Sequence, residues 1–348
     1  MGSVAVATRD VWFRRQLSGR ALGIAAALSV AALVIGRLAG VADSAALQTF
    51  TLLFVAISVE ALPFVLLGAF VAALVEVYAS DAVFTRFGNM RGSLQLPVAA
   101  LAGLAFPVCE CGSVPVARRF MRRGVSPMAA LAFMLAAPVI NPIVLVSTWV
   151  AYSPRGLGME MVLGRAGLGL VLAVAAGWAL GNEGTKELLR RRIEETPADA
   201  STGAHAHEHH APQQTRGQRF VTHLTGDFFF MGKFLIVGAG LAAAFQTVLP
   251  RSIISGIAGS ILISTLALMA VAFVSSLCSE ADAFVAVSFS PFPLGAQLGF
   301  LVFGPILDFK LAFLYGATFR KHFVARLTLV SIPVVLAGSL WFEAVVGL

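Results

Sequence analysis

The chain has 348 residues, of which 58% are hydrophobic and only 12% are charged. Soluble domains carry about 25% charged residues, so this composition excludes an ordinary water-soluble protein. Its net charge of +7 would suit nucleic acid, but the basic residues lie in short loops between apolar runs, a pattern typical of membrane orientation. We therefore expect an all-α polytopic membrane protein surrounded by lipid, with no nucleic-acid partner.

Apolar runs recur along the chain, and each is long enough to cross about 30 Å of hydrocarbon. Four arginines precede the first run, which we expect to be a retained helix rather than a cleaved signal. Three cysteines, an odd number, argue against a disulfide framework. The predicted full spans are residues 19–41, 49–77, 128–151, 160–181, 228–249, 295–316 and 327–346.

Two further apolar segments, residues 94–108 and 255–276, each run into a polar stretch. The first stretch is Cys-Glu-Cys-Gly-Ser-Val-Pro at 109–115, and the second is Ser-Ser-Leu-Cys-Ser-Glu-Ala-Asp at 275–282. Acids beside Gly or Pro at membrane depth are tolerated only where they are buried in protein or line a wet cavity. We predict that both segments are re-entrant hairpins that break and return to the side they left.

An internal repeat relates the two stretches. Superimposing Cys111 on Cys278 gives an offset of 167 residues, at which Pro138 meets Pro305 and Asn141 meets Asp308. Glu60 likewise meets Asp227. We predict an extra first helix (residues 1–48), a first membrane repeat (49–181), a linker (182–220) and a second repeat (221–348). Paired interrupted segments in corresponding halves indicate a transporter's binding site.

The positions of Lys and Arg predict the orientation. With re-entrant hairpins, 19 of the 25 basic residues fall on one side, and only Arg155 and Arg251 fall in loops on the other. The bias places the N-terminus and the linker in the cytoplasm, places the C-terminus outside, and makes the two repeats inverted. We expect the chain in the cell membrane.

The linker contains a run rich in histidine. Short tracts of this kind bind zinc-like metals, although a neutral spacer is the alternative. Its four histidines make a weak accessory metal site on a flexible loop: His205, His207, His209 and His210.

The polar stretches carry the candidate transport site. Thiolates suit zinc, copper(I) and other thiophilic ions, and carboxylates extend the ligand set to harder divalent metals. A short non-helical turn would offer both kinds of ligand, and the repeat would bring the second stretch to the same midplane. The alternative is that the cysteines are small inert hydrophobes. The residues concerned are Cys109, Glu110, Cys111, Ser113, Cys278, Glu280 and Asp282.

Two proline-containing breaks and one isolated acid extend this site. The breaks contain Asn141 and Asp308, which could coordinate substrate once proline has freed nearby carbonyls. The alternative is a structural kink in which Asp308 pairs locally with Lys310. Glu60 could serve as a proton relay or a cation site.

The segment Pro-Val-Cys-Glu-Cys-Gly-Ser-Val-Pro-Val-Ala-Arg-Arg, followed by Ala-Ala-Pro-Val-Ile-Asn-Pro, resembles the signature of a predicted-permease family. That family includes ArsP-type organoarsenical efflux permeases and YraQ/YcgR-like permeases. Ser-Leu-Cys-Ser-Glu-Ala-Asp and Gly-Pro-Ile-Leu-Asp-Phe-Lys also fit it, so that the resemblance covers residues 49–319. It implies transport of trivalent organoarsenicals in some members and zinc homeostasis in others. The arsenical branch has a small polar residue between the cysteines, so Glu110 favours a divalent cation.

We therefore predict a permease, not an enzyme, that moves a zinc-like thiophilic ion by alternating access and holds no permanent cofactor. A trivalent arsenical permease is one alternative. A membrane thiol redox carrier that cycles Cys109 and Cys111 to a strained disulfide is another. No Walker motif is present, so a proton gradient or a partner ATPase must drive transport. The sequence leaves open whether the partner is a second copy or an accessory subunit.

Overall fold

The computed structural model describes residues 45–78, 90, 92–104, 108–182, 188–189, 215–248 and 260–347. Residues 54–348 form one compact unit, which contains all described helices after α2 and most of α2 itself. The predicted span 19–41 and the histidine run lie outside the described residues. Apart from one isolated bridge between Leu189 and Phe319, the described part of the chain contains no β-structure.

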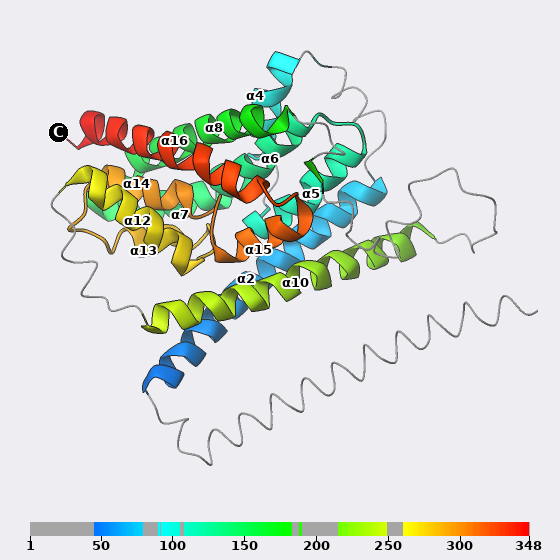
Figure 1. Cartoon of the computed structure of the whole chain (residues 1–348), viewed down its shortest axis with the longest axis horizontal. Helices are drawn as coiled ribbons and strands as arrows, with labels where there is room; N and C mark the ends of the chain where they lie inside the picture. The colour runs from blue at the N-terminus through cyan, green and yellow to red at the C-terminus, as the bar shows by residue number, and fades with distance from the viewer. Residues whose placement is uncertain are drawn as a thin grey trace, which may run out of the picture. The chain divides into compact units, whose positions relative to one another are not determined.

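The first half of the described chain contains six α-helices and a short 3-10 turn, η2 (Ser153–Arg155). The second half contains six α-helices (Figure 1). In chain order the helices are α2 (Ala45–Tyr78), α4 (Gly92–Ala102), α5 (Glu110–Arg122), α6 (Pro127–Ile140), α7 (Pro142–Tyr152) and α8 (Gly158–Gly181), then α10 (Arg216–Val248), α12 (Ile261–Ser275), α13 (Asp282–Ala286), α14 (Leu294–Phe303), α15 (Phe309–Thr318) and α16 (Phe323–Val346).

The two sets of helices agree in order at the predicted offset of 167 residues. Thus α6 and α7 correspond to α14 and α15, and α8 corresponds to α16. The largest difference lies in the hairpins, since α5 has 13 residues whereas α13 has five. The common order supports two copies of one unit, and their inverted relation stays a prediction.

Within the part of the chain that the structure describes, five segments are long and apolar enough to cross a membrane: Ala45–Tyr78, Pro127–Arg155, Gly158–Gly181, Arg216–Ala244 and Phe323–Val346. They coincide with five of the seven predicted spans. The predicted span 295–316 is instead two shorter helices, α14 and α15, because the chain breaks between Phe303 and Phe309. Large apolar side chains project from the long helices, among them Phe229 at 70% and Leu329 at 75% exposure, as lipid contact requires.

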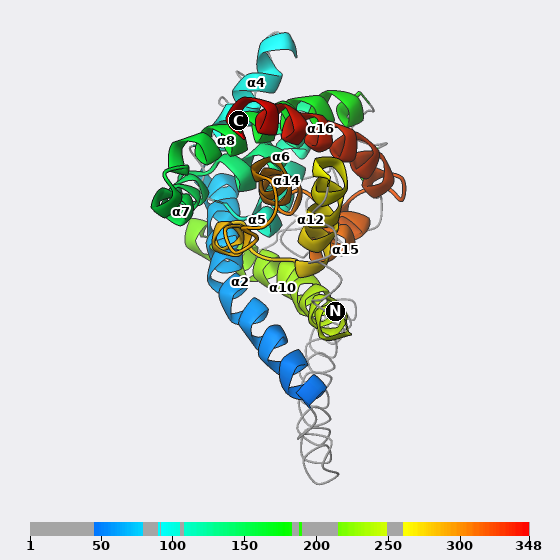
Figure 2. The same ribbon diagram turned by 90° about the vertical axis from the view of Figure 1, so that its left-hand side faces the viewer.

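Helices α6 and α14 form the core. Every residue of α6 from Ala129 to Ile140 is buried, and so is every residue of α14 from Gly295 to Phe303. Figure 2 shows both helices surrounded by the others. Helix α6 packs chiefly on α8, α4 and α5, while α14 packs on α12 and α16. Small side chains permit this close packing: a Cβ on Gly177 of α8 would lie 2.8 Å from the Met128 carbonyl at the start of α6.

The hairpin of each half packs against a broken helix of the other half. Helix α5 contacts α15, and α13 contacts α7. Both polar stretches are therefore held between the two halves.

Candidate functional site

The first polar stretch is the start of a helix. Glu110 and Cys111 occupy the first turn of α5, and Cys109 is its N-cap, accepting a hydrogen bond from the Gly112 amide at 3.4 Å. The prediction of a non-helical turn was therefore wrong for Glu110 and Cys111. A helix N-terminus carries partial positive charge, which favours an anionic carboxylate or thiolate in the first turn.

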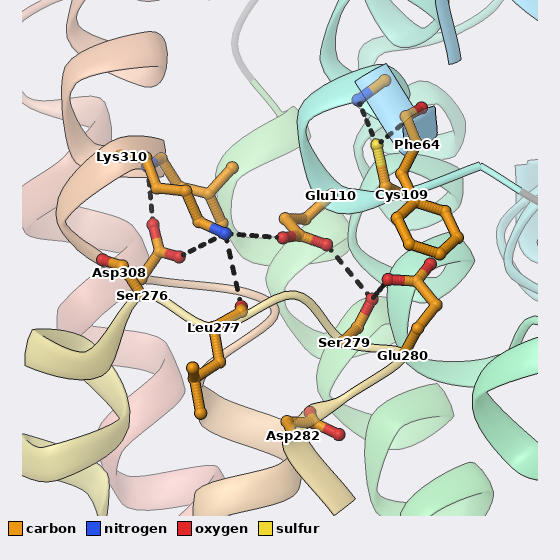
Figure 3. Close-up of polar contacts among 12 residues, drawn as sticks. Phe64, Cys109, Glu110, Ser276, Leu277, Ser279, Glu280, Asp282, Asp308 and Lys310 are labelled. Atoms are coloured by element: carbon orange, nitrogen blue, oxygen red, sulfur yellow. Dashed lines mark hydrogen bonds and ion pairs between the residues drawn. The ribbon is translucent and has the colours of Figure 1, made fainter. Parts of the chain in front are cut away.

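Glu110 meets Lys310 at the centre of the unit (Figure 3). The Lys310 ammonium donates to Glu110 Oε1 at 2.9 Å and to the Leu277 carbonyl at 3.3 Å, and it lies 3.4 Å from Asp308 Oδ2. Each of the three ionic side chains is 1% exposed. One ammonium therefore joins a carboxylate of the first half to a carboxylate of the second.

The second polar stretch reaches the same centre. The Ser279 hydroxyl lies 3.1 Å from Glu110 Oε2 and 3.4 Å from Glu280 Oε2, between the two carboxylates (Figure 3). The stretch is largely non-helical, and Ser276 adopts the left-handed conformation with φ of 48°. This backbone turns the Leu277 carbonyl and the Ser279 hydroxyl toward the centre, because the helix before them ends at Ser275.

A second buried ion pair joins the halves nearby. Arg165 of α8 is fully buried, and its guanidinium forms a fork with Asp282 at 2.8 and 2.7 Å. It also donates to Thr148 Oγ1 at 2.9 Å and to the Ser279 carbonyl at 3.2 Å. Arg165 thus fixes the backbone of the same serine whose hydroxyl contacts Glu110.

All three cysteines are buried and free. The Cys109 thiol donates to the Phe64 carbonyl of α2 at 3.4 Å, so its sulfur points toward α2 (Figure 3). Cys111 and Cys278 both lie within electrostatic range of Glu110, Glu280 and Lys310. The predicted thiols and carboxylates therefore gather around one centre.

Other predicted residues have local structural partners. Asn141 and Asp308 are the N-caps of α7 and α15, accepting from the amides of Val144 at 2.9 Å and Leu311 at 2.7 Å. Their equivalence in the repeat thus reflects equivalent helix starts, and one oxygen of each is already used. The Ser113 hydroxyl donates to the Glu110 carbonyl at 2.9 Å, within its own helix turn.

The two repeat-related acids occupy different surroundings. Glu60 is half-buried on α2, within electrostatic range of Lys310 and Glu110. Asp227 on α10 instead forms an ion pair with Arg119 at 2.6 Å, and Arg119 also contacts Glu76 at 3.2 Å. Asp227 is therefore part of a separate cluster that ties α5 to α2 and α10.

In this conformation the predicted ligands do not form a metal centre. Among the described residues, no three His, Cys, Asp or Glu side chains are arranged to hold a metal ion together. Lys310 takes one oxygen of Glu110, and the sulfur of Cys109 is turned to Phe64. His205, His207, His209 and His210 lie outside the described residues.

The sequence reasoning missed Arg165, Ser279 and Lys310 as members of this centre. A signal was available for the two cations, because a charged side chain inside a span requires a partner of opposite charge. Pairing them with acids of the other half would have found both ion pairs. Ser279 gave no comparable signal, because a neutral serine can satisfy its hydroxyl on nearby backbone and needs no partner of opposite charge.

Long apolar helices and buried charges at broken helices define a multi-pass α-helical membrane protein of the permease class. Residues 46–343 match the ArsP_1 predicted permease family, and the chain belongs to that family. It is 39% identical over 289 residues to the UPF0718 protein YcgR of Bacillus subtilis, covering 83% of this chain and 95% of that protein.

A second relative comes from Streptococcus mutans, where its name describes a candidate subunit of a two-component membrane permease complex. The identity is 30% over 276 residues, covering 79% of this chain and 88% of that protein. No solved structure matches the chain.

Proposed function

We propose that this permease moves a thiophilic metal ion, a zinc-like divalent cation, through a site formed by Cys109, Glu110, Cys111, Cys278 and Glu280. The observation that carries the proposal is the buried contact of Glu110 and Glu280 through Ser279, with thiols around it. Thiolate and carboxylate together are a ligand set for zinc-like ions.

The formal charges of the centre favour a cation. Arg165 and Asp282 form a bidentate pair and neutralise each other. The network then holds three carboxylates, those of Glu110, Glu280 and Asp308, against the single ammonium of Lys310. Buried charge without compensation is costly, so these carboxylates must share a cation or protons.

Alternating access supplies the rearrangement that the site needs. The polar stretches lie between two halves with the same helix order, and each hairpin contacts the opposite half. We infer that these halves are inverted copies, and that rocking one against the other changes the contacts of Glu110 with Lys310 and Ser279, which belong to the other half. Glu60 would lie on the route of the ion or of a coupled proton.

The arsenical and redox alternatives make different demands. A neutral trivalent arsenical needs the three buried thiols but not the carboxylates. A redox carrier needs Cys109 and Cys111 to pair, whereas Cys109 here caps α5 and bonds Phe64. The metal alternative accounts for the carboxylates as well as the thiols.

We further propose a partner in the cell membrane. The Streptococcus mutans relative is named as a complex subunit, and this sequence contains no Walker motif. A second copy or an accessory subunit would therefore supply energy or complete the complex. The N-terminus and the histidine-containing loop would be cytoplasmic, and the C-terminus outside.

The test is transport of zinc ions and of a trivalent arsenical into proteoliposomes. Cys111→Ser should abolish zinc transport, because a serine hydroxyl is a poorer ligand for a soft ion. The exposed Glu160 at the start of α8 provides a control, and Glu160→Gln should transport normally. Wild-type zinc transport by Cys111→Ser and by Cys109→Ser would overturn the proposal.

A further inference from the structure

Lys310 is the one cation that contacts the carboxylates of the central network among the described residues. Its ammonium has three partners, Glu110 Oε1, Asp308 Oδ2 and the Leu277 carbonyl, and a lysine has three donors. Two of these partners are carboxylates, and the third is a backbone carbonyl in the non-helical stretch that follows α12. This is also an oxygen environment that suits a metal ion.

The lysine can move while its backbone stays fixed. A Cβ on Gly238 of α10 would lie 2.6 Å from both Cα and Cβ of Lys310, so α10 packs directly against this backbone. Asp308 anchors the same turn by capping α15. The four-carbon stem of lysine is flexible, so its ammonium can swing between carboxylates without any backbone shift.

The two carboxylates hold the ammonium unequally. Glu110 Oε1 accepts a hydrogen bond from the ammonium at 2.9 Å. Asp308 Oδ2 lies 3.4 Å from the ammonium, and the other oxygen of Asp308 caps α15. An incoming cation that takes Glu110 would leave the ammonium with Asp308, which is already within reach. The Lys310 charge would then remain compensated throughout the exchange.

We propose that Lys310 is a built-in competitor of the transported cation: its ammonium holds Glu110 until a divalent metal ion displaces it toward Asp308. This inference rests on the proposed metal-ion permease and adds its specificity-determining residue. A competitor of this kind lowers the apparent affinity by the fraction of time for which Glu110 is available. It also selects divalent over monovalent ions, because a single positive charge gains nothing over the ammonium it replaces.

The test is zinc binding to the purified full-length protein, measured by calorimetry for three side chains at position 310. Lys310→Met removes the competitor and should bind zinc about tenfold more tightly, if Glu110 is available about a tenth of the time in the wild type. Lys310→Arg should bind zinc more weakly than the wild type, by about tenfold, because a guanidinium holds carboxylates as a bidentate fork and is harder to displace.

The arginine variant keeps the positive charge, so it tests the proposal even if Lys310→Met fails to fold. The control is Lys233→Met on α10, since Lys233 contacts the rings of Phe230 and Phe234 and not the site. That variant should bind zinc as the wild type does. A purely structural role would weaken binding in both Lys310 variants.

The competitor role would be overturned if the wild type, Lys310→Met and Lys310→Arg bound zinc with equal affinity. It would also be overturned if Lys310→Met bound zinc most weakly of the three. That failure is distinct from failure of the proposed function. If Glu110→Gln and Cys111→Ser bind zinc as the wild type does, the metal site itself is wrong. If both lose zinc while the Lys310 variants do not follow the expected order, only the competitor is wrong.

Discussion

At the scale of single residues, Glu110 combines several roles. Its carboxylate accepts from Lys310 and from Ser279, its carbonyl accepts from Ser113, and it begins α5. The sequence marked it as an acid between two thiols at membrane depth. The structure adds the partner that makes such an acid tolerable, a lysine 200 positions further along the chain.

Replacement of Glu110 by glutamine should separate the two substrate classes. A divalent cation requires the negative charge in a buried site, so we expect zinc transport to fall by more than about tenfold. A neutral arsenical held by thiols should be transported at close to the wild-type rate. Side-by-side uptake assays measure both, and equal loss of the two substrates would contradict this division.

At the scale of helices, two breaks position the centre. Pro142 is the first residue of α7, where its missing amide costs nothing, and Asn141 before it is extended and caps the helix. Asp308 is likewise extended and caps α15. The first turn of α15 therefore carries Lys310 to Glu110, and α7 carries Thr148 to Arg165.

The pair of Arg165 and Asp282 should stabilise the link between α8 and α13. Both side chains are buried, so Arg165→Met should destabilise the protein by about 3–5 kcal/mol, since it leaves a buried carboxylate unpaired. Thermal unfolding followed by tryptophan fluorescence in detergent measures this, with the exposed Lys321→Met as the control.

The double variant Arg165→Met/Asp282→Asn tests the pairing directly. It should unfold at a higher temperature than Arg165→Met alone, because no unpaired charge remains. If the losses of stability caused by Arg165→Met and by Asp282→Asn simply add in the double variant, the ion pair contributes no coupling energy. The link between α8 and α13 is then held by packing.

At the scale of the whole molecule, we predict that the two halves cross the membrane in opposite directions. Arg122 at the end of α5 and Ser290 after α13 occupy closely corresponding positions, and both are exposed. Inverted copies would place them on opposite faces of the membrane, as the strong bias of basic residues predicts.

Cysteine labelling decides the matter. Single cysteines at Arg122 and Ser290, in a background without the three native cysteines, should react with impermeant reagents from opposite sides. Labelling of both from one side would refute the inverted arrangement. Transport by the cysteine-free background is not required for this test, because only folding in the membrane matters.

The histidine run at residues 205–210 carries its own prediction. Deleting residues 205–210 should reduce zinc uptake at low metal concentration and leave the maximal rate unchanged, as expected for an accessory collector. Complete loss of transport would mean that the loop is part of the transport mechanism.

The sequence by itself determined the class, the helix order and the polar stretches. Hydrophobic run length and the placement of Arg and Lys are local properties, and the offset that aligns Cys111 with Cys278 also aligns the helices. The same offset pairs Asn141 with Asp308, which the sequence marked as candidate ligands at proline breaks and which the structure shows to be helix caps.

The tertiary structure alone decided which charges meet. From the sequence, Glu110 could pair with any buried cation, and a local pair of Lys310 with Asp308 was one alternative. The contact between α5 and α15 brings Lys310 within reach of both Glu110 and Asp308, and Asp282 at the start of α13 pairs with Arg165 of α8. Such pairs depend on packing between halves that are more than a hundred residues apart. A buried charge must be compensated by a group that lies beside it in space, and that group need not be near in the sequence.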